Sequence, residues 1–113
     1  MDLLKGLFGG STVPQIPPHD VKQRMAEGAV LIDVREPDEW RGGHAPGARH
    51  VPLGQLARHL PTLPREKDIL FICRSGNRSG RATEMARAAG LSATNVSGGM
   101  LAWAYAGLPV QQG

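Results

Sequence analysis

ILFICRSGNRS, residues 69–79, runs from an apolar segment into a polar turn. The four apolar residues Ile69–Ile72 are strand formers, and they lead directly to Cys73, the only cysteine of the chain. A helical pattern begins at Ser79 and continues to residue 89. A strand, a loop and a helix in this order place several backbone N–H groups around a small concavity at the positive end of the helix. Such a concavity binds anions and favours a thiolate over a thiol.

Cys73 has two possible roles, one structural and one chemical. A lone cysteine at the end of a strand is commonly a small buried hydrophobe. Packing alone, however, does not explain the Arg-Ser-Gly-Asn-Arg run that follows, which adds two permanent positive charges. Electropositive surroundings are typical of reactive cysteines. We therefore predict that Cys73 is a nucleophile and that the residues after it bind its substrate: Arg74, Ser75, Gly76, Asn77, Arg78 and Ser79.

Length and composition restrict the class of protein. The chain has 113 residues, of which 41% are hydrophobic and 20% charged, as in a globular protein with a single core. Aromatic residues make up 4%, too few for a platform on which bases stack, so nucleic-acid binding is not expected. With one cysteine and no Cys/His cluster, neither an internal disulfide nor a structural metal is expected. These features favour a monomer in a reducing, cytoplasmic compartment.

The organisation along the chain is one domain between two tails. We expect a flexible N-terminal tail over residues 1–13, a domain over residues 14–110 and a C-terminal tail over residues 111–113. Leu3, Leu4, Leu7 and Phe8 could share one helical face and make a weak contact with a partner or a membrane. The Gly-Gly-Ser-Thr run at residues 9–12 favours a frayed tail instead. No apolar run reaches the length of a membrane span, so firm membrane association is not expected.

Strand and helix patterns alternate along the domain. The continuous apolar run before Asp33 predicts a strand that is covered on both faces, as in a parallel sheet between helices. Alternating strands and helices indicate an α/β domain. The expected strands are 13–16, 29–34, 50–51, 69–72 and 94–96, and the expected helices are 18–27, 36–40, 53–60, 79–89 and 100–106.

The segment Cys73–Ser79 resembles the active-site loop of single-domain rhodaneses, which are sulfurtransferases that carry sulfur as a cysteine persulfide. Three further motifs share the resemblance: Leu31–Glu36, Gly43–Ala48, and Gly98–Met100 followed by Trp103. Together they span about residues 14–110. The resemblance implies a three-layer α/β domain with a five-stranded, mostly parallel sheet and helices on both faces. The Cys73 loop would then lie at the carboxyl end of a central strand, where open α/β sheets bind ligands.

The same resemblance implies a thiosulfate sulfurtransferase. Its Cys73 thiolate would take the outer sulfur of a small anionic donor such as thiosulfate, and the N–H groups of residues 74–79 would hold the persulfide. Cyanide or a thiol would then accept the sulfur. Arg74 and Arg78 would bind the anionic donor. No metal or organic cofactor is required.

Other polar residues have structural interpretations. We expect Asp33 and Arg35, which follow a buried strand, to form an ion pair that anchors the loops behind the site, although contact with substrate stays open. His44 is a general base by residue type, but a resting thiolate needs none, so we interpret it as structural. Gly98 and Gly99 suit a tight turn between closely packed backbones.

Two alternatives stay open at this point. In the first, a relative of phosphatases or arsenate reductases, five residues would separate the cysteine from the arginine, whereas four separate Cys73 from Arg78. The shorter loop makes a smaller ring, suited to a sulfur atom more than to a tetrahedral oxyanion. In the second, the protein is a relay or binding module that hands the persulfide to an acceptor protein. The loop chemistry would be the same, so the sequence does not separate this module from an enzyme.

Overall fold

The computed structural model describes residues 13–113, and the predicted N-terminal tail with its leucine-rich segment lies outside the described residues. The elements alternate as the sequence predicts, and the α/β class is confirmed. In chain order they are β1 (Gln15–Ile16), η1 (Pro18–Asp20), α2 (Val21–Ala26), β2 (Val30–Asp33), α3 (Pro37–Arg41), β3 (Arg49–His50), α4 (Leu53–His59), η2 (Leu60–Thr62), β4 (Ile69–Ile72), α5 (Asn77–Ala88), β5 (Ala93–Val96) and α6 (Gly99–Tyr105).

The five strands form one sheet in the order β1-β5-β4-β2-β3. Every neighbouring pair is parallel, so the expected parallel sheet is confirmed. The strand that precedes Cys73, β4, lies in the middle, with β2 on one side and β5 on the other. All residues of β2, β4 and β5 are buried, because helices cover both faces of the sheet.

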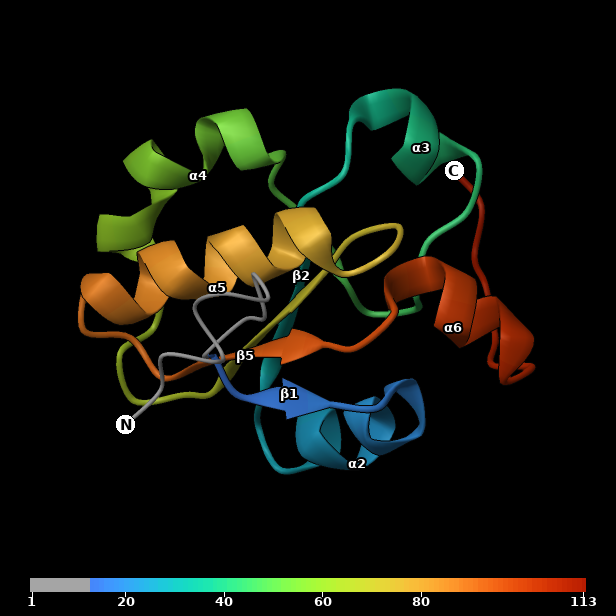
Figure 1. Cartoon of the computed structure of the whole chain (residues 1–113), viewed down its shortest axis with the longest axis horizontal. Helices are drawn as coiled ribbons and strands as arrows, with labels where there is room; N and C mark the ends of the chain where they lie inside the picture. The colour runs from blue at the N-terminus through green and yellow to red at the C-terminus, as the bar shows by residue number, and fades with distance from the viewer. Residues whose placement is uncertain (1–12) are drawn as a thin grey trace, which may run out of the picture.

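Two apolar clusters, one on each face of the sheet, make the core. On one face, Ile32, Phe71 and Cys73 pack with Leu56 of α4 and Ala82 of α5. The opposite face joins alternate residues of the same strands to α2 and α6 through Leu31, Ile72, Val21, Met100 and Trp103. Figure 1 shows α4 and α5 together on one side of the strands and α2 on the other. The predicted three layers are therefore present.

The boundaries of several elements differ from the sequence prediction. The helix after Cys73, α5, begins at Asn77, two positions before the predicted start, because its N-cap is Gly76, a residue type that is accepted at N-caps and that tolerates the φ of +106° found here. The predicted helix over residues 18–27 divides into the 3₁₀ turn η1 and the short α2. The edge strand β1 has only two residues, since prolines at 14 and 17 limit its ladder.

A tight Gly98–Gly99 turn brings the start of α6 against the residues after β4. Both glycines have positive φ, +71° and +55°. A Cβ on Gly99 would overlap the carbonyl oxygen of Cys73, so no larger residue fits. The close approach lets the Met100 N–H donate to the Cys73 carbonyl at 2.7 Å and the Leu101 N–H donate to the Arg74 carbonyl at 3.0 Å. The glycine pair thus fixes the backbone beside the cysteine.

We predict that Gly99→Ala lowers the free energy of unfolding by about 2 kcal/mol or more, because alanine is strained at this φ and its Cβ meets backbone. Urea denaturation measures the change. As a control, Gly54 in α4 has open space around its Cα, so Gly54→Ala should raise the free energy of unfolding by about 0.5–1 kcal/mol. Equal effects of the two substitutions would contradict the close-approach interpretation.

Candidate active site

Cys73 is the first residue after the central strand β4, at the carboxyl end of the sheet. The next three residues turn the chain, and α5 starts behind Gly76 with no side-chain cap. The first N–H groups of a helix have no partner within the helix, so they are free to donate to an acceptor that lies beyond the helix start. The thiol of Cys73 occupies this position, as the strand-loop-helix pattern predicts.

The sulfur of Cys73 accepts hydrogen bonds from the loop and from the helix. The Gly76 N–H donates to Sγ at 3.1 Å, and the Ser79 hydroxyl donates at 3.2 Å. Both Cys73 and Ser79 are fully buried, at 0% exposure, so water competes little for these bonds. The hydroxyl of Ser79 is oriented inward from the first turn of α5, whose next buried hydroxyl, on Thr83, donates to the Ser79 carbonyl at 2.7 Å.

These hydrogen bonds lower the pKa of Cys73. Burial of the thiol raises the pKa, but the Ser79 hydroxyl and the backbone N–H groups of Ser79, Gly76 and Ser75 together outweigh it. A lowered pKa means a larger thiolate fraction at neutral pH, because the charged form is the one that accepts all these bonds. The leading causes are hydrogen bonds, whereas the sequence interpretation relies equally on the two arginine charges.

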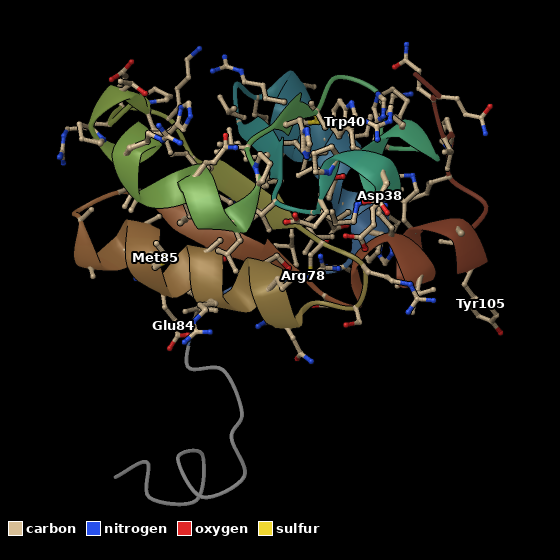
Figure 2. All side chains as sticks on the ribbon, turned by 90° about the horizontal axis from the view of Figure 1, so that it is seen from above. Asp38, Trp40, Arg78, Glu84, Met85 and Tyr105 are labelled. Carbon is tan, nitrogen blue, oxygen red and sulfur yellow. The ribbon has the colours of Figure 1, made fainter. Side chains whose placement is uncertain are left out.

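Arg78 forms a bidentate ion pair with Glu39 of α3. Its Nη1 donates to Oε1 at 2.7 Å and its Nη2 donates to Oε2 at 2.9 Å. The pair lowers the pKa of Glu39 to about 2 and raises that of Arg78. Glu39 also accepts the Glu36 N–H at 3.0 Å, which completes a capping box at the start of α3. Figure 2 shows Arg78 in the first turn of α5, on the side that faces α3.

Glu39 is a site residue that sequence reasoning missed. Acidic residues at the start of α3 are favourable to its helix dipole, and this explains their presence without any role in the site. The spacing of Glu36 and Glu39 predicts a capping box, but the ion pair with Arg78 joins residues 39 positions apart. Only the fold reveals it.

The other loop side chains do not reach the sulfur. Arg74, Ser75 and Asn77 are not fully buried, and none of their side chains has a hydrogen bond or ion pair within residues 13–113. Ser75 contributes through its backbone N–H alone. The structure therefore brings Gly76 and Ser79 to the thiol, places Arg78 against Glu39, and leaves Arg74 as an unpaired charge at the surface of the described chain.

The predicted ion pair of Asp33 and Arg35 is present. Arg35 Nε donates to both carboxylate oxygens at 3.0 Å, and its Nη2 donates to Oδ2 at 2.8 Å. The same Nη2 donates to the Gly43 carbonyl at 2.7 Å, which ties the loop after β2 to the loop after α3. Within the described chain, neither side chain forms a hydrogen bond to the Cys73 loop. The pair anchors loops, which is the structural alternative that the sequence favoured.

His44 is buried and packs as a structural residue. Its ring stacks on Trp40 with centroids 3.5 Å apart, and its Nδ1 is bonded to the Trp40 carbonyl at 2.9 Å. The ring of His50 stacks on Trp40 at 4.8 Å, and its Nε2 is bonded to the Arg35 carbonyl at 2.7 Å. These contacts join α3 to the Arg35 anchor. Among the hydrogen bonds of residues 13–113, His44 makes none to Cys73.

The part of the chain that the structure describes has neither a cluster of metal ligands nor a helix that could span a membrane. It contains no group of three or more His, Cys, Asp or Glu arranged to hold a metal ion. Over residues 13–113, no helix has the length and apolar character needed to cross a membrane.

An apolar groove of about 370 Å³ lies between the α2 region and α6, lined partly by Met25, Pro46 and Trp103. No residue of the Cys73 loop lines it.

Comparison with known proteins identifies relatives of this chain and of its fold. The family model described as "Rhodanese-like domain" matches residues 17–106. A protein named "Sulfurtransferase" from Allochromatium vinosum is 34% identical over 101 residues, covering 87% of this chain and 94% of the relative. The crystal structure of a rhodanese-related protein from Thermoplasma volcanium has a TM-score of 0.82 and 31% identity, covering 88% of this chain and 99% of that one.

Another relative is much longer than this chain. An HTH-type transcriptional regulator of Mycobacterium tuberculosis is 38% identical over 95 residues, which cover 82% of this chain but 42% of the regulator. The chain therefore spans less than half the length of that relative. Domains of this kind occur both in proteins of about this size and as parts of larger ones.

We predict that Ser79→Ala raises the pKa of Cys73, because it removes the hydroxyl that donates to Sγ and leaves the backbone donors in place. The pH dependence of alkylation by iodoacetamide measures the change. Ser75→Ala is the matched control, since only the backbone of Ser75 contributes and its pH profile should stay that of the unmodified protein. Identical profiles for both variants would contradict the role of the hydroxyl.

Proposed function

Because this chain belongs to the rhodanese-like domain family, we propose that it is a sulfurtransferase that carries sulfur as a persulfide on Cys73. The observation that supports this most directly is the cradle around the thiol, which consists of the Gly76 N–H and the Ser79 hydroxyl at 3.1 and 3.2 Å from Sγ. Hydrogen bonds of this kind stabilise an anionic sulfur, which is the form required both for attack and for a bound persulfide.

In the first half-reaction, thiosulfate or a similar donor supplies a sulfane sulfur. The Cys73 thiolate attacks the outer sulfur, a new S–S bond forms, and the bond between the two donor sulfurs breaks. Sulfite leaves with the electron pair, and Cys73 carries a persulfide. Because Cys73 is buried, a donor whose reacting sulfur is terminal fits better than one whose sulfur lies within a chain.

In the second half-reaction, an acceptor takes the outer sulfur. Cyanide attacks that sulfur and leaves as thiocyanate, or a thiolate attacks it and leaves as a persulfide; in both cases Cys73 returns to the thiolate. No proton transfer to the leaving group is needed, which agrees with the packing of His44 against Trp40. Covalent transfer in two separate steps predicts ping-pong kinetics.

The two loop arginines would bind the dianionic donor in different ways. Arg74 is exposed and has no partner within residues 13–113, so the donor can bind it without displacing another group. Arg78 is already held by Glu39, and the donor must share or displace that carboxylate to use it. The lowered pKa of Glu39 keeps the carboxylate charged above about pH 2 and therefore competing at neutral pH.

A second candidate function is the relay of persulfide to an acceptor protein. The large hydrophobic residues that are exposed in the described chain are Leu101 and Tyr105, on α6, and Val110, in the segment that follows it. The start of α6 is bonded to the Cys73 loop, and Tyr105 points away from the domain in Figure 2. Apolar side chains on the element that contacts Arg74 suit an acceptor with apolar and acidic surface. Transfer that is fast to such a protein thiol and slow to small thiols would favour the relay.

Incubation with thiosulfate should add the mass of one sulfur atom to the protein, and cyanide should remove it again. Intact-mass measurement before and after each step tests the proposal. Cys73→Ser is the control and should gain no sulfur, because Cys73 is the only thiol in the chain. Sulfur on the folded serine variant, or none on the unchanged protein with any sulfane donor, would overturn the proposed function.

Arg74→Ala and Arg78→Ala should each lower kcat/KM for thiosulfate by about tenfold or more, because each removes a charge-assisted contact with the donor. Arg81, exposed on α5 and without a partner in the described residues, is the control, and Arg81→Ala should leave kcat/KM unchanged. Steady-state kinetics at fixed cyanide measure all three. Wild-type values in both loop variants would mean that backbone donors alone bind the anion.

Glu39→Gln separates donor binding from a purely structural role of Arg78. If Arg78 binds the donor, weakening its pair with residue 39 should leave kcat/KM at least as high as in the unchanged protein. A loss in Glu39→Gln equal to that in Arg78→Ala would instead show that Arg78 serves only to hold α3 against α5.

A further inference from the structure

Asn95 is a polar residue in a strand that is otherwise suited to apolar ones. It lies in β5, all of whose residues are buried, and its own exposure is 3%. Asparagine is disfavoured in strands, and a buried amide costs free energy unless its groups are hydrogen-bonded. A valine or leucine would suit the position better on both counts. A residue that breaks the local rule in this way points to a specific task for its side chain.

The amide nitrogen of Asn95 has two acceptors in separate parts of the fold. Nδ2 donates to the Gly76 carbonyl at 3.1 Å and to Oε1 of Gln15, in the edge strand β1, at 3.0 Å. The Gly76 carbonyl also accepts the first helical bond of α5, from the Gly80 N–H at 3.0 Å. Gly76 is therefore held from two sides, by the sheet and by its own helix.

The amide oxygen shows that the direction of the amide matters. Oδ1 of Asn95 is buried and has no hydrogen-bond partner within the described residues. Turning the amide over would bring this oxygen against the Gly76 carbonyl, another acceptor, and would remove the bond that Nδ2 makes there. The fold leaves one acceptor unsatisfied and keeps the donor aimed at Gly76. Isolated buried groups of this kind are uncommon in proteins and call for an explanation.

We propose that Asn95 is a positioning residue for Cys73: its Nδ2 holds the Gly76 carbonyl, which helps to fix φ and ψ of Gly76, the residue whose N–H donates to the sulfur. Asn95 does not bond to the sulfur itself. It acts through a glycine that lies between β4 and α5 with a φ of +106°, and a Cβ at that glycine would lie 3.3 Å from the Gly98 nitrogen. The inference rests on the proposed function only in taking Cys73 as the reacting group.

Asn95→Leu tests this, since leucine has a similar size and no donor. The midpoint of the pH profile for alkylation of Cys73 by iodoacetamide should move to higher pH, and the alkylation rate at pH 7 should fall about threefold or more. The reason is that the Gly76 carbonyl then keeps only its bond from the Gly80 N–H, so the Gly76 backbone is held less firmly beside the sulfur. Loading of sulfur from thiosulfate should fall by a similar factor. Asn95→Ala should behave the same way and replaces the leucine variant if that protein does not fold.

Thr94→Val is the matched control. Thr94 is the neighbouring buried polar residue of β5, its side chain points to the opposite face, and it makes no side-chain hydrogen bond within the described residues. Its alkylation profile should equal that of the unchanged protein, even where urea denaturation shows a comparable loss of stability. A folded Asn95 variant with an unchanged profile would overturn the proposal, and so would equal shifts in the Asn95 and Thr94 variants.

Alkylation needs no sulfur donor, so this test is independent of the proposed function. If the unchanged protein takes up no sulfur but the Asn95 variants still move the profile, the proposed function fails and the positioning role stands. If the unchanged protein takes up sulfur and the Asn95 variants alkylate like it, the positioning role alone fails.

Discussion

The rest of the structure depends on one interaction, the hydrogen bonding of the buried Cys73 sulfur at the first turn of α5. A helix start without a side-chain cap leaves N–H groups that need an acceptor, and a buried thiolate needs donors. The helix start and the sulfur therefore satisfy one another, because the Gly76 N–H and the Ser79 hydroxyl both donate to Sγ. Because these donors outweigh the effect of burial, the pKa of Cys73 is lowered. The proposed chemistry depends on that balance.

The rest of the fold holds this arrangement from several directions. The sheet supplies Cys73 at the end of its central strand, and Gly99 permits α6 to bond the Cys73 carbonyl. On the other side, Arg78 and Glu39 join α5 to α3, and the Asp33–Arg35 pair anchors the loop that leads into α3. Asn95 adds a contact from β5 to the middle of the loop. The contacts of Met100, Leu101 and Asn95 hold the backbone of residues 73–76 directly, whereas the two ion pairs act on the elements around it.

The sequence predicted the parts of this picture that depend on short stretches of chain. Apolar runs indicated the order of strands and helices, and the polar turn after Cys73 pointed to the reacting group. The predicted start of α5 was wrong by two residues, because Gly76 is the N-cap and the helix therefore begins at Asn77 instead of Ser79. The Glu39 and Asn95 contacts escaped prediction for a physical reason: their partners lie 39 and 19 positions away. Only the packed sheet brings these groups together.

The pH titration of the thiolate absorbance of Cys73 in the unchanged protein tests the central claim most directly. Cys73 is the only thiol, so the signal has a single source. The cradle of N–H and hydroxyl donors predicts a midpoint clearly below about 8.5, the value of a free cysteine. A midpoint at or above that value would mean that burial outweighs the donors, and the thiolate on which the proposed chemistry depends would not be the resting form.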